Sequence, residues 1–334
     1  MSTSSSYPIK ISVVIPVFNI VDFLPICLDS VLKQTYKNIE VILIDDGSTD
    51  GSEKICDQFL SIDSRVKVYH KNNTGVSDSR NLGVRMSNGD YVCFIDGDDF
   101  IEHEYFENAV TVLSTHSPTL LINSYKLYYA NNKTIDTFKK GEPKQIKKEE
   151  FLKGIFEGLY YNWAPVSKFY HLSIIRKVTF NPKYSYGEDL LFIFDLIKIL
   201  SEDDIVFYAP ICSYMYFQRE SSACYSYPIE KKYDCIKICE YIIRNADSEI
   251  SEYVYLNYYL RFLIRLKYRM LECNYDKMSA YYIKCSSVSK ENWITNLINP
   301  KMNLKAKVLL ILNLLPDKLF HHIVSLFIKG SSIN

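Results

Sequence analysis

Short apolar runs alternate with helical stretches over about the first 110 residues of the 334-residue chain. Three of the four runs are nearly continuous and rich in β-branched residues, as expected of strands buried on both faces of a parallel sheet. This alternation predicts βαβ units. The predicted strands are residues 11–18, 39–45, 65–70 and 91–96, and the predicted helices between them are residues 21–33, 50–60 and 76–87.

The remainder of the chain predicts a mixed segment followed by helices. We expect strands over residues 118–128, 204–209 and 211–218, helices over 149–160 and 188–200, a Lys-rich polar loop over 131–148, and helices from about residue 229 onward. The predicted organisation is therefore an α/β domain over residues 1–225, with halves at 10–115 and 116–225, and a helical region over 226–334.

Three of the predicted strands end in polar residues that are able to do chemistry. These strands end in the segments Pro16 to Asn19, Asp45 to Ser48 and Asp96 to Asp99. Ligands of parallel α/β sheets bind beyond the carboxyl ends of the strands, so these three segments are expected to converge on one crevice.

The acidic segment Asp96-Gly97-Asp98-Asp99 gives the strongest local signal. Carboxylates at one strand end repel each other unless a cation neutralises them, and Mg²⁺ or Mn²⁺ holding a diphosphate fits such oxygen ligands. Capping of a following helix explains one of these carboxylates but not three. At Asp45-Asp46-Gly47-Ser48, hydrogen bonding to a ribose or base and a plain turn with a cap both remain open.

Four segments carry a resemblance to a known family: residues 12–19 (SVVIPVFN), 45–51 (DDGSTDG), 75–83 (GVSDSRNLG) and 89–99 (GDYVCFIDGDD). In this order they resemble the family 2 glycosyltransferases of the GT-A fold, specifically over about residues 10–115 and more loosely to about residue 220. The resemblance implies a Rossmann-like, mainly parallel sheet flanked by helices, here with a helical C-terminal extension. It also implies inverting transfer of one sugar, most often a hexose, from a nucleotide diphosphate donor, usually UDP-linked.

The resemblance also assigns residues to the donor. It implies that Pro16, Val17, Phe18 and Asn19, together with Asp45 or Asp46, hold the base and ribose, and that Arg80, with Asn73 and Gly75 nearby, supports the nucleotide or diphosphate. Asp96, Gly97 and Asp98 match the Asp-x-Asp motif, in which Asp98 and Asp96 would hold Mn²⁺ or Mg²⁺, with Asp98 the direct contact.

An inverting transfer needs a general base for the acceptor hydroxyl. Glu188-Asp189 opens a predicted apolar helix and resembles the family's Glu-Asp pair, in which the Asp is the base; a helix N-terminus that complements the dipole is the alternative. Trp163 is a candidate for stacking on a sugar or for packing, and Lys168 and Arg219 are candidates for acceptor or diphosphate contacts or for plain surface charges.

The balance of charge adds a constraint on partners. The chain has 39 Lys and Arg against 39 Asp and Glu, which argues against a nucleic-acid binder. Residues 1–110 nevertheless carry eight more acidic than basic residues, and residues 111–334 carry the opposite excess.

The nine cysteines lack a Cys-x-x-Cys pair, and the spacing of Cys235 and Cys239 is typical of two residues on the buried face of one helix. The histidines, His70 included, predict neither a metal site nor a catalytic triad.

The C-terminal region alternates lysines with apolar residues over 301–329, and Pro316 separates two short predicted helices. Packing on the first domain, a contact between copies in a homo-oligomer, and an interfacial membrane contact remain open. The chain lacks a window of about 18 uninterrupted apolar residues, so we expect no segment that spans a membrane. The scattered cysteines favour reduced thiols and hence a cytoplasmic protein, with peripheral contact on the inner face of the membrane left open.

The acceptor is expected to be a glycan, a lipid-linked oligosaccharide or a glycoprotein. The sequence lacks Gln-x-x-Arg-Trp, which marks processive synthases, so transfer of a single sugar is expected. A nucleotidyltransferase fits poorly because a Gly-rich phosphate loop does not follow the first strand. The alternative that remains is a non-catalytic carbohydrate-binding or scaffold subunit on a degenerate transferase domain.

Overall fold

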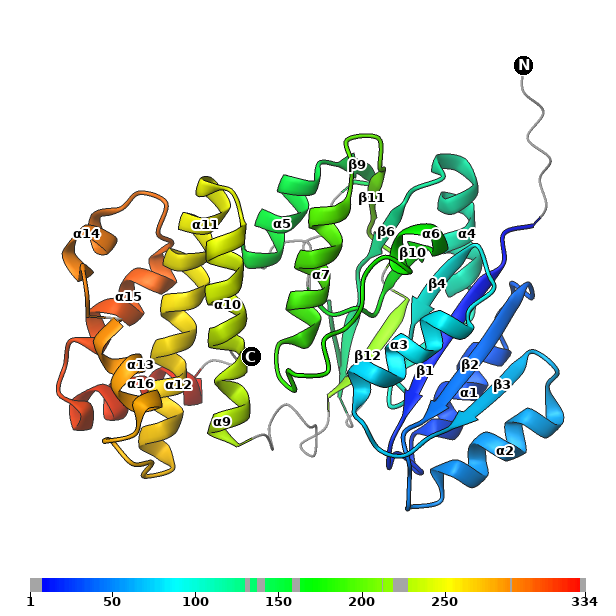
Figure 1. Cartoon of the computed structure of the whole chain (residues 1–334), viewed down its shortest axis with the longest axis horizontal. Helices are drawn as coiled ribbons and strands as arrows, with labels where there is room; N and C mark the ends of the chain where they lie inside the picture. Colours follow the sequence, from blue (N-terminus) through cyan, green and yellow to red (C-terminus); the bar gives the residue numbers. More distant parts are fainter. Residues whose placement is uncertain are drawn as a thin grey trace. The chain divides into compact units, whose positions relative to one another are not determined.

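The computed structural model describes residues 8–129, 133–136, 142–157, 163–211, 213–218, 228–288 and 290–330. Contacts divide the chain into two compact units, each with its own core. The first comprises residues 1–183 and 188–222, and the second comprises residues 184–187 and 223–334. Figure 1 shows the elements of both units.

An eight-stranded sheet forms the centre of the first unit, in the order β3-β2-β1-β4-β10-β6-β11-β9. Strands β1 to β4 pair in parallel, and β10 is antiparallel to both β4 and β6. Every residue of β2 is buried, which confirms the prediction from its apolar run. The strands are β1 (Ile11–Val17), β2 (Ile39–Asp45), β3 (Val66–His70), β4 (Tyr91–Phe94), β6 (Leu120–Asn123), β9 (Lys144–Ile146), β10 (Lys168–His171) and β11 (Val206–Ala209).

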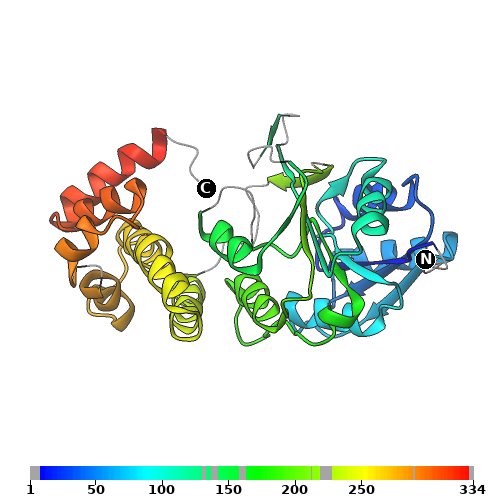
Figure 2. The ribbon, with the colours of Figure 1, turned by 90° about the horizontal axis from the view of Figure 1, so that it is seen from above.

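Helices cover both faces of this sheet (Figures 1 and 2). They are α1 (Leu24–Leu32), α2 (Ser52–Ile62), α3 (Val76–Met86), α4 (Tyr105–His116), α5 (Lys148–Glu157), α6 (Leu172–Ile175) and α7 (Glu188–Ile199). Helix α3 lies close against β1 because it carries Gly83, where a Cβ would stand 2.2 Å from Val14 Cγ1. This close packing fixes where the polar face of α3 meets the strand ends.

A smaller sheet in the order β5-β12-β7-β8 contains β5 (Phe100–Ile101), β7 (Lys126–Tyr129), β8 (Thr134–Asp136) and β12 (Tyr214–Gln218). Two expectations are corrected here. Residues 118–128 form two strands, β6 and β7, that belong to different sheets. The expected loop over 131–148 contains β8 and β9, because pairing of β9 with β11 buries Ile146 opposite Val206; the Lys-rich composition did not reveal that tertiary partner.

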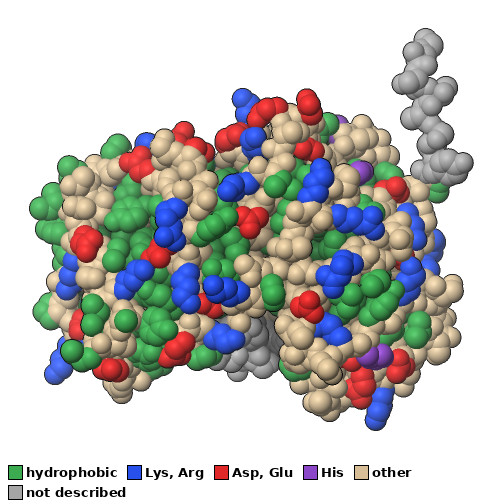
Figure 3. Space-filling view, viewed as in Figure 1, with side chains coloured by type: hydrophobic (Ala, Val, Ile, Leu, Met, Phe, Trp, Pro, Cys, Tyr) green, Lys and Arg blue, Asp and Glu red, His purple; other side chains and the backbone are tan. Residues whose placement is uncertain are grey.

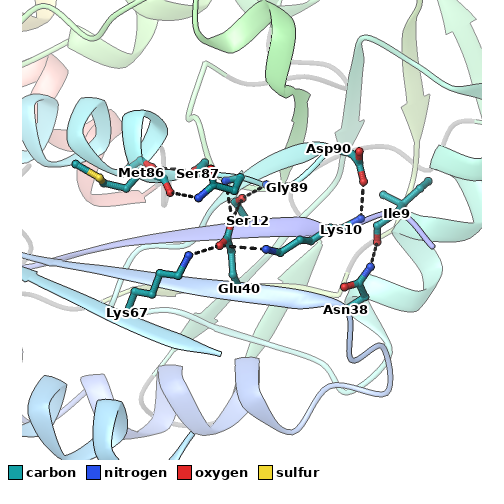
Figure 4. A network of polar contacts seen from close by, with 12 residues as sticks. Ile9, Lys10, Ser12, Asn38, Glu40, Lys67, Met86, Ser87, Gly89 and Asp90 are labelled. Atoms are coloured by element: carbon teal, nitrogen blue, oxygen red, sulfur yellow. Dashed lines mark hydrogen bonds and ion pairs between the residues drawn. The ribbon is translucent and has the colours of Figure 1, made fainter. Parts of the chain in front are cut away.

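A buried carboxylate ties the strands together at the end of the sheet where β1 and β2 begin (Figure 4). Glu40 accepts hydrogen bonds from Ser12 Oγ at 2.6 Å, Lys67 Nζ at 2.7 Å and Asn88 N at 2.7 Å. Burial acts to raise the pKa of Glu40, but these partners outweigh it and lower the pKa to about 2. Glu40 therefore stabilises the sheet as an ion.

The second unit is helical, as predicted. Its elements are α9 (Ile229–Lys232), α10 (Asp234–Asn245), α11 (Ser248–Val254), a π-helical turn (Tyr255–Tyr259), α12 (Leu260–Glu272), α13 (Ala280–Val288), α14 (Trp293–Ile298), α15 (Leu304–Asn313) and α16 (Asp317–Gly330). Cys235 and Cys239 lie in its core, which confirms the packing interpretation of their spacing. Residues 184–187 belong to this unit, where the Tyr186 ring packs 6.2 Å from that of Phe262.

Helices α15 and α16 are separate, as Pro316 predicts. Leu304, Val308 and Ile311 of α15 are exposed, and they recur at helical spacing. Figure 3 shows hydrophobic side chains over this unit with Lys and Arg among them. Among the residues that the structure describes, no helix is both long and apolar enough to cross a bilayer.

Candidate active site

The predicted convergence of strand ends follows from the strand register. Val17 pairs with Asp45, and Asp45 pairs with His70, along parallel strands β1, β2 and β3. Strand β4 pairs with the other side of β1 and leads into Asp96 to Asp99. The carboxyl ends of four strands therefore meet at one edge of the sheet, where ligands of such sheets bind.

Arg80 of α3 joins two parts of this site. Its Nη1 donates to Asp189 Oδ1 at 2.8 Å, and its Nη2 donates to Asp96 Oδ1 at 2.9 Å. The side chain is 5% exposed, and the guanidinium lies 5.4 Å from the centroid of the Phe180 ring. Two carboxylates thus share one buried cation, which links the Asp-x-Asp segment to the first turn of α7.

Asp189 has the properties of a general base. It lies in the first turn of α7, beside Glu188, at a side-chain exposure of 23%. Burial, together with the charges of Glu188 and Asp96, raises the pKa of Asp189 to about 8 against the opposing effect of Arg80. Burial also raises the pKa of Glu188. A carboxylate with a pKa near neutrality is a stronger proton acceptor than an exposed one.

The third carboxylate of the acidic segment, Asp99, has a structural contact set. The buried Asp99 side chain accepts hydrogen bonds from Tyr214 Oη at 2.6 Å and from Phe217 N at 2.8 Å, both on β12. Burial, together with the charges of Asp98 and Asp96, raises the pKa of Asp99 well above its usual value. Tyr214 Oη in turn accepts from Asp96 N at 3.2 Å, so β12 shapes this loop.

These contacts change the argument for a metal ion. Arg80 forms an ion pair with Asp96, and β12 donates the hydrogen bonds that Asp99 accepts. The mutual repulsion of three carboxylates therefore does not by itself require a metal cation. Within the described ranges, no three His, Cys, Asp or Glu side chains are grouped to hold a metal. The half-buried Asp98 still fits an ion whose remaining ligands come from a diphosphate and water.

The two carboxylates at the end of β2, Asp45 and Asp46, have different contacts. Asp45 accepts from Ser48 N at 3.0 Å and lies 2.8 Å from His70 Nδ1. Asp46 accepts from Lys71 Nζ and from the backbone N–H groups of Thr74 and Gly75, each at 2.8 Å. Asp46 thereby fixes the loop that contains Asn73 and Gly75, whereas Asp45 lines an open surface hollow at the strand ends.

The end of β1 is held in place by its neighbours. Asn19 has a positive φ of 50°, and its Oδ1 accepts from Thr49 N at 2.9 Å. At Gly97, a Cβ would stand 2.4 Å from Ile20 Cδ1 and 3.2 Å from Pro16 O, so a larger residue would require the Ile20 side chain and the strand end to shift. Val17 is buried, and the ring of Phe18 is exposed at the same edge.

The residues expected to contact the acceptor or diphosphate lie in different environments. Lys168 is buried, donates to Ala164 O at 2.6 Å, and has its pKa lowered to about 7 by burial against the charge of Asp189. Lys168 is therefore not the plain surface charge that was one expectation. Trp163 is half-buried, and Arg219 lies outside the described residues.

His70 is the residue at this edge that the sequence did not indicate. Its Nδ1 lies 2.8 Å from Asp45 Oδ2 and its Nε2 lies 3.1 Å from Asp57 Oδ1. These two contacts were not predicted. The available signal was its place at the end of β3, directly opposite Asp45 in the parallel register.

Comparison with known sequences agrees with this geometry. The family model described as glycosyl transferase family 2 matches residues 12–174. The glycosyltransferases GlyA and GlyG of Streptococcus pneumoniae serotype 4 are each 40% identical, over 116 and 119 residues that cover 35% of this chain. Those alignments span 17% of GlyA and 40% of GlyG, so they concern one domain of this chain and less than half of either relative.

Comparison with solved structures covers nearly the whole chain. S. aureus TarS 1-349 in complex with UDP superposes with a TM-score of 0.62 over 97% of this chain and 93% of that one, at 18% identity. The complex of TarS with UDP-GlcNAc gives a TM-score of 0.61 at 19% identity. At this identity the likeness establishes a shared fold, namely the predicted GT-A fold with its helical C-terminal region.

Proposed function

We propose that this chain is a family 2 glycosyltransferase that moves one hexose, with inversion, from a UDP-sugar to an acceptor hydroxyl; residues 12–174 match the model of that family. The observation that carries the proposal is the pair of 2.8 Å and 2.9 Å contacts by which Arg80 joins Asp189 to Asp96. They link a carboxylate suited to proton removal with the segment that resembles a diphosphate site.

The donor occupies the carboxyl edge of the sheet in this proposal. Asp45 and the residues from Pro16 to Asn19 contact the base and ribose. Arg80 and the loop of Asn73 and Gly75 lie toward the diphosphate. The UDP and UDP-GlcNAc complexes of TarS, a protein of the same fold, support a uridine nucleotide as the first choice.

The chemistry assigned to Asp189 is removal of the acceptor's proton. The acceptor oxygen attacks the anomeric carbon as Asp189 takes the hydroxyl proton. The bond from that carbon to the phosphate oxygen breaks, and its electron pair leaves with UDP. Attack from the face opposite the leaving diphosphate inverts the anomeric configuration.

Charge on the departing UDP must be met as it develops. Arg80 supplies one buried positive charge. Its planar guanidinium can bind phosphate oxygens in place of the two carboxylates. Asp98 and Asp96 are the residues that would hold Mn²⁺ or Mg²⁺, which supplies further neutralisation of the diphosphate when bound. Glu188 is proposed to set the electrostatic environment of Asp189 rather than to take the proton.

The acceptor is proposed to be a glycan, a lipid-linked oligosaccharide or a glycoprotein, with Trp163, Lys168 and Arg219 as candidate contacts. The exposed apolar residues of α15 and its lysines also keep a peripheral membrane contact and a contact between copies as proposals. Co-sedimentation with anionic vesicles tests the first, and the sedimentation coefficient without lipid tests the second.

A donor screen tests the proposed function. The purified chain is incubated with Mn²⁺ and a panel of UDP-, GDP- and dTDP-sugars, and released nucleotide is measured with and without oligosaccharide acceptors. Release from a UDP-hexose that is lost in Asp98→Asn supports the proposal. Tight UDP binding without turnover on any donor and acceptor would favour a non-catalytic carbohydrate-binding subunit instead.

A further inference from the structure

His70 stands between two carboxylates that belong to different elements. Nδ1 of its ring lies 2.8 Å from Asp45 Oδ2 on β2, and Nε2 lies 3.1 Å from Asp57 Oδ1 on α2. The Asp45 side chain is 4% exposed, whereas that of Asp57 is 61% exposed. A ring that faces carboxylates through both nitrogens satisfies both of them only when both nitrogens carry protons.

The same ring lines the hollow at the strand ends, together with Asp45, Gly47 and Ser48. Within that hollow, one oxygen of Asp45 accepts from Ser48 N and the other faces His70. These two contacts fix the plane of the carboxylate, so its remaining lone pairs point in a defined direction. A carboxylate held in this way is prepared to accept a hydrogen bond from a ligand.

We infer that His70 is a positioning residue for nucleotide binding: held by Asp57, it orients Asp45 to accept a hydrogen bond from the base or ribose of the donor. The inference rests on the proposed function, because it takes the hollow as the nucleoside site. It adds His70 and Asp57, neither of which the motifs indicated, and it makes donor affinity depend on the protonation of one imidazole.

The charges around the ring support a protonated imidazole. The hydrogen bond to Asp45 raises the pKa of His70 above its ordinary value, burial opposes this, and Asp57 adds to the increase. The other titratable side chains that line the hollow are Glu53 on α2 and Lys71, which follows His70 in the chain, and the Cys56 thiol of α2 lies near both Asp45 and Asp57. Below the pKa of His70, the ring donates a hydrogen bond to each of the two carboxylates. Above it, one nitrogen loses its proton and one carboxylate loses its donor, so affinity for the nucleotide is expected to fall.

The test is the dissociation constant of UDP with Mg²⁺, measured by calorimetry from pH 6 to pH 9. For His70→Ala, the dissociation constant should exceed that of the unaltered chain by about tenfold at pH 6, the effect of one charge-assisted hydrogen bond, and this ratio should be smaller at pH 9, where the neutral ring donates to only one of the two carboxylates. In the transfer assay the loss should appear in KM for the donor, with kcat nearly unchanged. His103→Gln, at an exposed position away from this edge, is the matched control.

The variant Asp57→Asn distinguishes this role of His70 from a purely structural one, because it changes the pH dependence of UDP binding. Removing this partner should lower the pKa of His70, so the pH at which UDP affinity declines should shift to lower pH while the affinity at pH 6 changes less than in His70→Ala. The His70 ring signal, followed by NMR without ligand, should show the same shift. This second measurement remains decisive if His70→Ala fails to fold.

The outcomes separate the inference from the proposed function. If the unaltered chain binds no UDP at any pH, the proposed function fails. If it binds UDP but the ratio for His70→Ala is constant with pH, or Asp57→Asn leaves the midpoint in place, the function stands and the role of His70 is overturned.

Discussion

Arg80 Nη1 lies 2.8 Å from Asp189 Oδ1, although the two residues are 109 positions apart in the chain. The contact brings the polar face of α3 to the first turn of α7, beside the loop that holds Asp96. In the proposed mechanism, donor binding and proton removal are therefore connected through one buried guanidinium. A phosphate that draws Arg80 away from Asp189 would leave that carboxylate available to the acceptor.

Replacement of Arg80 by lysine tests this connection. A lysine ammonium keeps the charge but lacks the planar fork that contacts two carboxylates at once. We expect Arg80→Lys to lower kcat by about 100-fold, the usual order for the loss of one preorganised donor at a developing charge. Steady-state kinetics with the best UDP-sugar gives this value. Arg85→Lys, exposed in the last turn of the same helix, should change kcat less than twofold, and an equal loss in both variants would contradict the account.

The pH dependence of kcat/KM tests the role of Asp189. Burial raises the pKa of Asp189 to about 8, so the carboxyl is protonated, and inactive as a base, below that pH. Below pH 8 we expect kcat/KM to rise about tenfold per pH unit and then to level off. A profile that is flat from pH 6 to pH 8, with UDP affinity measured at each point, is incompatible with Asp189 as the base.

The buried Glu40 predicts an effect on stability rather than on activity. Its pKa is lowered to about 2, so ionised Glu40 stabilises the fold above the ordinary glutamate pKa, and this stabilisation is lost as pH falls toward 2. Glu40→Gln should lower the free energy of unfolding at pH 7 by up to about 3 kcal/mol. Urea unfolding of this variant and of the exposed control Glu107→Gln measures the difference, which should shrink as the solution is acidified toward pH 2. A constant difference would rule out the ionic contribution.

Tyr214 predicts a link between the smaller sheet and the acidic loop. Its hydroxyl donates to Asp99 at 2.6 Å and accepts from Asp96 N. Tyr214→Phe leaves both buried groups short of a partner, which should cost about 1–3 kcal/mol of stability and weaken UDP binding. Thermal unfolding and calorimetry measure the two effects, with Tyr69→Phe on the partly exposed strand β3 as the control. Unchanged UDP affinity would show that β12 does not shape the donor site.

Much of the first unit could be predicted from sequence because its strands are buried on both faces. Continuous apolar runs such as that of β2 fit few other environments, and strand ends in a parallel sheet meet at one edge. Asp96 was singled out from its strand end, whereas Arg80 and Asp189 were singled out from the resemblance to the family. Their mutual contacts were not predicted, because a salt bridge between α3 and α7 depends on where each helix lies, and the position of α3 is set by its packing on β1 through Gly83 and Val14.

The remaining errors have the same physical origin. The Lys-rich segment around β9 acquires its strand only by pairing with β11, and a polar segment gives little local sign of such a partner. Asp99 was grouped with two candidate metal ligands because the sequence did not show that β12 supplies its hydrogen bonds. The contacts of His70 were not predicted because its partners lie 25 and 13 positions away in the sequence.

The most direct test of the central claim compares Asp189→Asn with the unaltered chain in the presence of Mn²⁺ and the UDP-sugar chosen by the screen. The account predicts that acceptor-dependent UDP release falls by at least about 1,000-fold, while the dissociation constant for UDP stays within about threefold. Retention of more than a tenth of the turnover by a folded, UDP-binding Asp189→Asn protein would contradict it.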